Sequence, residues 1–552
     1  MLKTYTYPKY DYRVAPEIAS GKTLKVPVVI VGAGPVGLGM ALDLDLQGIR
    51  VLLLDEDDTV SIGSRGVCYA KRALEILDRY GVGEAVCAKG VSWNVGRTFF
   101  RESEVYNFNL VPEPDHHRPG MVNLQQYYLE EYLVTRAAAR PGIDLRWKNK
   151  VVSVAQAEKG VTLTVETPDG LYAVEADWLI AADGARSPIR RMLGLEVEGK
   201  IFMDRFLIAD VVMKADFPAE RWFWFDPPFH PNQSVLLHKQ TDSVFRIDFQ
   251  LGWDADPEAE KRPENVIPRI KAMLGDQREF ELEWVSVYTF QCRRMGRFNH
   301  GRVLFVGDAA HQVSPFGARG ANSGLQDADN LGWKLKLVME GKAPARLLES
   351  YSEERVYAAD ENLMNSTRST DFITPKSRAS RTFRNAILSL AKDHAFGRSL
   401  VNSGRLSVPS FLVESSLNTP DEDSFTGRML PGAPLDDAPV EKEGLPSWLL
   451  QSTGNRFQLM VFVDDPSTTD TSALSRLNVG GIPVEPLLVS RTAATASALP
   501  CVHDVRGIAA QRYDARPGTS YLIRPDQHVA ARWRSFDAEK IHSAVARATC
   551  QQ

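Results

Sequence analysis

The chain has 552 residues, which at ~150 residues per domain predicts three or four folding units. Its formal net charge of −5 and its 24 % charged residues give no reason to expect a nucleic-acid partner or an anionic membrane. The 44 % hydrophobic residues exclude wholesale disorder, and five scattered cysteines with no CxxC motif exclude a disulfide scaffold and a zinc module. We therefore expect a cytoplasmic protein without a metal site.

The N-terminal region shows no targeting signal. Residues 1–12 carry four tyrosines and lack the apolar core of a signal peptide. The longest uncharged stretch, residues 26–42, contains four glycines and two prolines and is too short and too interrupted to cross a membrane. We expect no membrane association.

The first motif is typical of a dinucleotide-binding unit. Residues 28–31 are a β-branched run that predicts a buried parallel strand, and a second strand at 51–54 ends at Asp55. A GxGxxG loop lies between them, formed by Gly32, Gly34 and Gly37. The first glycine permits a tight turn, the second lets backbone N–H groups approach a pyrophosphate, and the third allows close helix packing. Asp55, with Glu56 beside it, is placed to bind a ribose hydroxyl, so the motif predicts a bound dinucleotide and leaves NAD and FAD open.

Two later segments also have the form of a strand followed by a turn. Residues 176–187 predict a strand that ends in an Asp-Gly pair, and residues 301–311 predict one that ends in Gly-Asp-Ala-Ala-His. A glycine-rich segment, residues 315–324, and an amphipathic helix predicted over residues 324–339 follow. With the GxGxxG loop, these motifs resemble the FAD-dependent aromatic hydroxylases, the single-component flavoprotein monooxygenases related to p-hydroxybenzoate and phenol hydroxylase.

The resemblance implies a bound FAD and assigns residues to it. The GxGxxG glycines would hold the FAD pyrophosphate and Asp55 the adenosine ribose. Arg65 would lie near the FAD phosphates and the ribityl chain, and Gln126 would contact the flavin. Asp183 belongs to the motif that serves both FAD and the pyridine nucleotide, and Asp308 would hydrogen-bond the ribityl chain.

The glycine-rich segment before the predicted helix is a second expected cofactor contact. Free N–H groups and the positive end of the helix would stabilise negative charge on a reduced isoalloxazine ring. The residues placed there are Gly317, Gly320, Ala321 and Asn322. His311, within the third motif, is expected to make a structural hydrogen bond rather than to act in catalysis.

Residues 201–290 predict an antiparallel β-sheet that is inserted into the FAD domain and covers the flavin. The predicted strands are 206–212, 222–225, 234–238 and 244–250. On the last strand Arg246, Asp248 and Gln250 alternate with apolar residues, and a polar sheet face more often meets solvent than lines a pocket. We nevertheless expect Arg246 and His238 to contact the substrate, because the family builds its substrate site from such strands.

One position departs from the family pattern. The phenol hydroxylase branch often has an acidic residue shortly before the glutamine matched by Gln126, and this chain has Asn123. A branch histidine is likewise replaced by Val67. Asparagine orients a hydroxyl group but does not accept its proton at neutral pH. The departure predicts either another base, for which His238 is a candidate, or a substrate that arrives ionised.

The last third of the chain predicts a separate domain. Six prolines between residues 404 and 446 indicate a linker, and residues 447–552 resemble the C-terminal thioredoxin-like domain of the phenol hydroxylase branch. Cys501 has no CxxC partner and is expected to be structural or to contact a dimer partner. The predicted fold is thus α/β, with a Rossmann-like FAD-binding domain in two parts (residues 1–200 and 291–403).

The activity that the resemblance implies is hydroxylation of a phenolic or hydroxylated heteroaromatic ring in aromatic catabolism, by a homodimer. NAD(P)H would reduce FAD, dioxygen would add at flavin C4a, and the hydroperoxide would pass one oxygen to the carbon ortho or para to the ring oxygen. A flavin-dependent halogenase is an alternative, although residues 222–227 depart from the WxWxIP motif at Asp226. A non-catalytic flavoprotein that uses its C-terminal domain as an interaction module is another. A plain NAD dehydrogenase is disfavoured by the second and third motifs.

Overall fold

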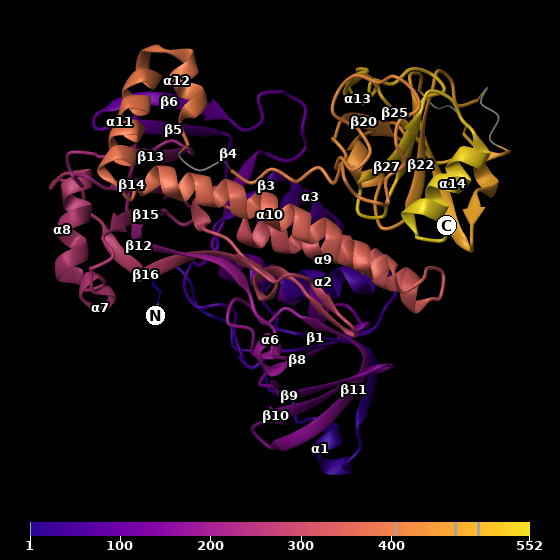
Figure 1. Cartoon of the computed structure of the whole chain (residues 1–552), viewed down its shortest axis with the longest axis horizontal. Helices are drawn as coiled ribbons and strands as arrows, with labels where there is room; N and C mark the ends of the chain where they lie inside the picture. The colour runs from indigo at the N-terminus through magenta and orange to yellow at the C-terminus, as the bar shows by residue number, and fades with distance from the viewer. Residues whose placement is uncertain (1, 403–405, 468–471, 494–496) are drawn as a thin grey trace.

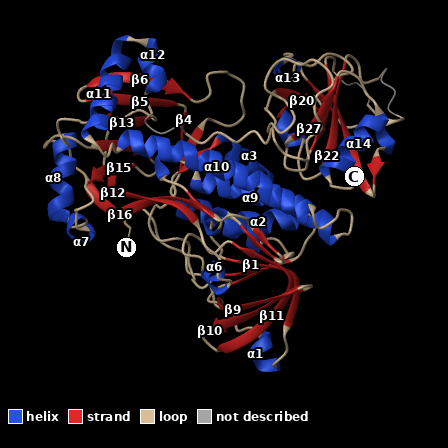
Figure 2. Ribbon diagram, viewed as in Figure 1, coloured by secondary structure: helices blue, strands red, loops and turns tan. Residues whose placement is uncertain are grey.

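The computed structural model describes residues 2–402, 406–467, 472–493 and 497–552. Figure 1 shows one sheet around β1 and β11, a second sheet around β12 to β16, and a separate C-terminal body around β22. The long helices α9 (Gly320–Met339) and α10 (Leu347–Ile373) run across the centre of the molecule. Figure 2 shows helices and strands combined in all three parts, so the predicted α/β class is confirmed.

The first sheet has eight strands and a parallel centre in the order β17-β18-β11-β1-β2-β8. Its strands are β1 (Leu24–Val31), β2 (Val51–Leu54), β8 (Ile143–Arg146), β9 (Lys150–Ala157), β10 (Gly160–Thr167), β11 (Gly170–Ala181), β17 (Asn299–His300) and β18 (Val303–Phe305). Helix α2 (Pro35–Leu46) connects β1 to β2, and α5 (Gln126–Ala138) precedes β8. The β-branched run of β1 is buried, as expected of a central parallel strand. The predicted strands at 28–31 and 51–54 are confirmed.

The second sheet also has eight strands, in the order β19-β16-β12-β15-β14-β13-β5-β6. They are β5 (Val95–Phe100), β6 (Ser103–Asn109), β12 (Glu198–Val212), β13 (Arg221–Phe225), β14 (Ser234–Lys239), β15 (Val244–Leu251), β16 (Glu281–Arg294) and β19 (His311–Gln312). The four predicted strands lie within β12 to β15. The sheet is larger than predicted, and it is not purely antiparallel, because β13 pairs in parallel with β5 from the first part of the chain.

Smaller elements connect the two sheets. A three-stranded sheet consists of β3 (Cys68–Ala70), β7 (Met121–Asn123) and β4 (Val91–Trp93). The other helices of this half are α1 (Pro16–Ser20), α3 (Lys71–Arg79), α4 (Gly83–Lys89), α6 (Pro188–Met192), α7 (Pro257–Glu260), α8 (Pro263–Leu274), α11 (Arg378–Asp393) and α12 (Ala395–Leu400). Helix α8 packs on the face of the second sheet that carries Leu237 and Ile247, so only the other face is left for a ligand.

The C-terminal body has its own sheet, in the order β21-β20-β25-β24-β22-β26-β27 with β23 beside β24. Its elements are β20 (Pro439–Lys442), β21 (Leu445–Trp448), β22 (Phe457–Val463), β23 (Asn478–Val479), β24 (Ile482–Ser490), β25 (Cys501–His503), α13 (Ile508–Arg512), β26 (Ser520–Ile523), β27 (Val529–Trp533) and α14 (Ala538–Ala548). Residues 525–526 lie in the turn between the paired strands β26 and β27. The sheet begins at β20, inside the predicted linker, while the predicted boundary at 403–404 lies outside the described residues. The thioredoxin-like fold remains a prediction.

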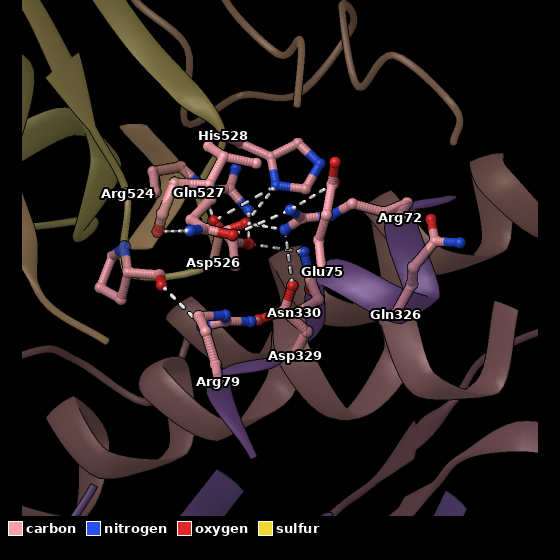
Figure 3. Close-up of polar contacts among 12 residues, drawn as sticks. Arg72, Glu75, Arg79, Gln326, Asp329, Asn330, Arg524, Asp526, Gln527 and His528 are labelled. Atoms are coloured by element: carbon pink, nitrogen blue, oxygen red, sulfur yellow. Dashed lines mark hydrogen bonds and ion pairs between the residues drawn. The ribbon is translucent and has the colours of Figure 1, made fainter. Parts of the chain in front are cut away.

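A buried ion network joins this body to the rest of the chain, and Figure 3 shows the part of it around Arg72, Asp329 and Asp526. Arg524, in the turn after β26, donates to both carboxylate oxygens of Glu354 on α10, at 2.6 and 2.9 Å. Arg524 also binds Asp526, and Lys334 of α9 donates to Glu354 at 2.7 Å. Arg72 of α3 donates to the backbone oxygen of Asp526 at 2.8 Å. The network therefore ties the β26–β27 turn to three helices of the other half.

In the described part of the chain, no helix is both long and apolar enough to cross a bilayer. The same residues contain no group of three or more histidine, cysteine or acidic side chains arranged to hold a metal ion.

Candidate active site

The first two predicted motifs pack directly on each other. Gly32 has φ +103°, and a Cβ atom there would lie 2.5 Å from the backbone oxygen of Ala182, next to Asp183. A Cβ atom on Gly37 would overlap the backbone oxygen of Gly32 at 1.8 Å. A Cβ atom on Gly34, in contrast, would have no neighbour within 4 Å. Gly34 therefore presents open backbone at the N-terminus of α2, which fits a pyrophosphate.

The third motif converges on the same place. A Cβ atom on Gly324 of α9 would lie 2.5 Å from Cγ2 of Val36 on α2 and 3.2 Å from Cα of Gly307. A Cβ atom on Gly320 would lie 3.8 Å from Oδ1 of Asp308. The glycine loop, the Asp308 turn and the start of α9 therefore surround one site, although almost 300 residues separate the first from the last.

Asp55 and Glu56 differ in environment. Oδ2 of Asp55 accepts a hydrogen bond from the Ala33 N–H at 2.5 Å, and Oδ1 accepts one from the Asp57 N–H at 2.9 Å. Burial raises the pKa of Asp55. Asp55 thus ties the end of β2 to the glycine loop, whereas Glu56 is exposed and pairs with Lys150 at 3.4 Å.

Asp183 and Asp308 both lie beside the glycine loop. Oδ2 of Asp183 accepts a hydrogen bond from the Ile189 N–H at 3.0 Å, at the start of α6. Asp308 is open to solvent, yet burial of its surroundings raises its pKa. The carboxylate of Asp308 is therefore accessible and lies next to the start of α9, as the predicted contact with a ribityl chain requires.

The start of α9 was predicted too late. The helix begins at Gly320 rather than at 324, so Gly320, Ala321 and Asn322 form its first turn. Only Gly317 precedes it, at the end of a short 3-10 helix, Pro315–Gly317. Asn322 accepts a hydrogen bond from the Ala70 N–H at 2.8 Å and donates to the backbone oxygen of Cys68 at 2.9 Å. Tertiary contact with β3 supports this extra turn, which the glycines alone disfavour.

His311 has the structural role expected of it. Its Nε2 contacts Oδ2 of Asp327 at 2.6 Å, and Asp327 also accepts hydrogen bonds from the Gly307 N–H and from Arg355. His311 and Arg355 lower the pKa of Asp327 despite its burial. The prediction of a structural hydrogen bond is confirmed.

Residues 61–66 form a loop, here called the Arg65 loop, that several elements hold in place. Gln126 accepts a hydrogen bond from the Gly66 N–H at 2.8 Å and donates to Glu130 at 2.7 Å. Glu130 in turn accepts hydrogen bonds from Ser61. The Arg65 side chain is exposed. Gln126 thus positions the loop that carries Arg65.

The polar face of the second sheet is buried. The strand register places Arg221, His238, Arg246, Asp210 and Trp284 side by side across five strands. All but Trp284 are less than 6 % exposed. The alternation in the sequence identified this face correctly. A polar sheet face more often meets solvent, but here the Arg65 loop covers it.

Arg246 is largely occupied by the Arg65 loop. It donates to the backbone oxygen of Ser64 and, at 3.4 Å, to that of Arg65. Its Nε lies 3.3 Å from Oδ1 of Asp210. The other oxygen of Asp210, Oδ2, accepts a hydrogen bond from the Ser64 hydroxyl. Asp210 and Ser64 were not singled out in the sequence, and only the register and this contact bring them to the site.

His238 lies between two guanidinium groups. Burial first, and then Arg221 and Arg246, hold its pKa well below the ordinary value, so the imidazole is neutral. Its Nδ1 is buried and has no hydrogen-bond partner among the described residues. His238 is therefore suited to hydrogen-bond a ligand and is a weak base.

Asn123 makes three contacts with protein groups. Its Oδ1 accepts hydrogen bonds from Trp93 at 2.8 Å and from the Cys68 thiol at 3.1 Å, and its Nδ2 donates to the backbone oxygen of Lys239 at 2.9 Å. Asn123 thus connects the three-stranded sheet to the end of β14. Its amide group is thus used mainly to hold these elements together.

The comparisons with known proteins agree with this geometry. Residues 25–366 match the family model described as an FAD binding domain. The 3-(3-hydroxy-phenyl)propionate/3-hydroxycinnamic acid hydroxylase of Burkholderia cenocepacia (strain HI2424) is 28 % identical over 521 residues, 92 % of this chain and 94 % of that protein. The hydroxylase of the same name from Mycolicibacterium smegmatis is 29 % identical over 371 residues, 66 % of this chain and 64 % of that protein. That second match spans less than two thirds of the relative.

Two solved structures are similar as well. The flavin-dependent monooxygenase PieE, in complex with FAD and substrate, has a TM-score of 0.79 at 25 % identity and covers 96 % of this chain and 100 % of its own. The p-nitrophenol 4-monooxygenase PnpA of Pseudomonas putida DLL-E4 has a TM-score of 0.61 at 26 % identity and covers 68 % of this chain and 96 % of its own. Because the family model covers more than half of the chain, the protein belongs to the FAD binding domain family, and FAD is its cofactor.

Proposed function

We propose that this protein is an FAD-dependent monooxygenase that hydroxylates a phenolic or hydroxylated heteroaromatic substrate with NAD(P)H and dioxygen. The observation that carries the proposal is the position of the buried polar sheet face directly beside the converged FAD motifs. FAD, when bound, supplies hydride acceptance and oxygen transfer. The protein has to bind and orient the ring, exclude water and manage the proton of the ring hydroxyl.

The cofactor contacts in this proposal follow from the geometry above. The open backbone at Gly34 takes the pyrophosphate, and Arg65 neutralises it. Asp55 accepts from the adenosine ribose, Asp308 binds the ribityl chain, and the first turn of α9 faces the flavin ring with its positive end. These assignments fit the open backbone at Gly34 and the accessible carboxylate of Asp308.

The substrate lies in this proposal between the flavin and the second sheet. Phe316, in the loop before α9, packs on Phe206 at 4.9 Å and on Phe290 at 5.2 Å between ring centroids, which makes one end of the site apolar. Arg221 and His238 bound the polar end. An aromatic ring with one polar substituent matches such a site.

The names of the relatives guide the choice of substrates. The curated relatives are named for hydroxyphenyl and hydroxycinnamic acids, and PnpA is named for p-nitrophenol. A panel of hydroxyphenylpropionates, hydroxybenzoates, nitrophenols and hydroxypyridines therefore tests the proposal. The homodimer and the thioredoxin-like fold of the C-terminal body belong to the same proposal and are tested by sedimentation and by a crystal structure.

The decisive experiment follows NADH, NADPH and oxygen consumption by the FAD-loaded protein with this panel under ¹⁸O₂. We expect one substrate to stimulate NAD(P)H oxidation, and mass spectrometry to find one ¹⁸O atom in the product. Oxidation without ¹⁸O in any product would contradict the proposal. Products that form only with added chloride would support a halogenase instead, although Trp222 and Trp224 lie on the sheet face away from Phe316.

A further inference from the structure

Asp248 lies in the middle of the sheet face that meets the FAD motifs. On β15 it is paired with Leu236 of β14 and with Ile208 of β12. Two residues before it on the same strand and face lies Arg246, which holds the Arg65 loop. Across the sheet, Leu236 pairs in turn with Phe223 of β13, whose ring lies 6.3 Å from that of Phe316. Asp248 is therefore bracketed by the two segments that approach the flavin.

The carboxylate of Asp248 lacks the hydrogen-bond donors that the buried acids Glu354 and Asp327 have. Its Oδ1 is buried and accepts no hydrogen bond from the described residues, and 12 % of its side chain remains accessible. The nearest cationic atom is Nε of Arg246 at 3.9 Å, and the same nitrogen lies closer, at 3.3 Å, to Asp210. A buried oxygen without a donor is costly unless a ligand supplies one.

The charged and titratable groups around Asp248 come from four other strands and its own. They are Arg246 on β15, His238 on β14, Asp210 on β12, Arg221 on β13 and Cys68 on β3. Burial, followed by Asp210, raises the pKa of Asp248 to about 6, against the lowering effect of the two arginines. The carboxylate is thus ionised at neutral pH and is a stronger base than an exposed aspartate.

We propose that Asp248 is the general base that takes the proton of the substrate's ring hydroxyl. The O–H bond breaks, the proton moves to the carboxylate of Asp248, and the electron pair stays on the ring oxygen, where it enriches the ortho and para carbons. Arg221 and Arg246 stabilise the phenolate, and the net charge of the site does not change. The inference rests on the proposed hydroxylase function. It supplies a base for the ring hydroxyl, because Asn123 cannot accept a proton at neutral pH and His238 is a weak base.

The first test compares Asp248→Asn with Asp254→Asn, an exposed aspartate beyond the end of the same strand. With a weakly acidic phenol we expect Asp248→Asn to lower kcat by about 100-fold or more and to remove the loss of kcat/KM below pH ~6. With a nitrophenol that is already ionised at the assay pH, we expect less than a threefold effect. An equal loss with both substrates, or no loss, would overturn the inference, and Asp254→Asn should match the wild type throughout.

A second measurement does not depend on turnover. Calorimetric titration of the FAD-loaded protein with a nitrophenol, in buffers of different ionisation enthalpy, counts the protons released, while visible absorbance counts the phenolate formed. At a pH below the ligand's own pKa, we expect the wild type to form bound phenolate with almost no proton release, and Asp248→Asn to release about one proton per phenolate. Equal release by both proteins would overturn the inference.

The two proposals fail in different ways. If the wild type places no ¹⁸O in any product, the hydroxylase function fails, and the proton count still decides the role of Asp248. If the wild type hydroxylates phenols and Asp248→Asn does so equally well, only the base assignment fails. If Asp248→Asn does not retain FAD, the wild-type profiles decide: the acidic limb near pH 6 has to be present with the weakly acidic phenol and absent with the ionised one.

Discussion

The molecule contains two buried polar regions that differ in how their carboxylates are paired. At the contact between the C-terminal body and helices α9 and α10, both oxygens of Glu354 are held by Arg524, with Lys334 adding a third donor. On the face of the second sheet, Asp248 and His238 each keep a buried polar atom without a partner. Charges that serve the fold are neutralised within the protein, whereas a site for a ligand leaves donors and acceptors for it.

The pKa directions follow the same division. Arg524 and Lys334 lower the pKa of Glu354 despite its complete burial. Burial dominates at Asp248 and raises its pKa to about 6. The C-terminal body is thus joined to the FAD domain by matched charges, which favours a fixed structural part over a freely available interaction module.

The largest expected effect on stability comes from breaking the ion pairs of Glu354 at the contact with the C-terminal body. Arg524→Met leaves Glu354 with one cation fewer and Asp526 without its guanidinium partner. We expect a loss of about 3–5 kcal/mol in the free energy of unfolding, measured by urea denaturation. The control is Arg506→Ala, which removes an exposed ion pair between the same two parts, with Asp115, and should cost less than ~1 kcal/mol. Similar losses of stability in the two variants would show that the buried ion pairs contribute no more than the exposed one.

Asp43 tests whether a missing partner alone identifies a ligand site. It lies on α2, is 1 % exposed, and has an Oδ1 without a partner, yet Gly332 and Tyr80 pack against it and leave no hollow. Burial, followed by Asp329, raises its pKa to about 8. Because the folded pKa lies above the unfolded one, the unfolded state loses its proton first, and stability falls as pH rises from about 4 to about 8.

Asp43→Asn should therefore be more stable than the wild type, by an amount that grows up to pH ~8 and then stays constant. We expect the difference to widen by roughly 3–4 kcal/mol between pH 5 and pH 8, at ~1.4 kcal/mol per pH unit. Thermal unfolding across this range measures it, with the exposed Asp57→Asn as control. A difference that does not change with pH would mean that Asp43 is ionised in the folded protein, like the paired acids.

The smallest expected effect concerns the link between the polar face of the second sheet and the cofactor. Arg246→Lys keeps a positive charge near Asp210, but one ammonium group cannot reach Asp210 and the carbonyls of Ser64 and Arg65 together. We expect the FAD dissociation constant, measured by flavin fluorescence, to rise about tenfold, equivalent to about 1.4 kcal/mol. The exposed Arg262→Lys should have no effect. An unchanged constant would show that the Arg65 loop does not depend on the sheet.

Much of the cofactor site follows from the sequence because its determinants are local. The GxGxxG loop, Asp55 at the end of β2 and Asp308 after β18 each depend on a strand and the turn that follows it, and periodicity identifies both. The start of α9 was missed because Asn322 gains its helical position from hydrogen bonds to Cys68 and Ala70, about 250 residues away. Local propensity carries no information about such partners.

For the substrate side, the sequence alone determined which residues share a face and nothing about what covers that face. Alternation along β15 placed Arg246 and Asp248 together. Only the folded chain brings the Arg65 loop onto Arg246, brings Phe316 beside Phe223, and leaves Oδ1 of Asp248 without a donor. Likewise, the prolines of residues 404–446 and a family resemblance predicted a C-terminal domain. The pairing of Arg524 with Glu354, in contrast, spans 170 residues and exists only once both parts are packed. The hydrophobic periodicity of a strand or helix and the residues of a turn act between near neighbours in the sequence. Burial and charge pairing, in contrast, are properties of the tertiary structure.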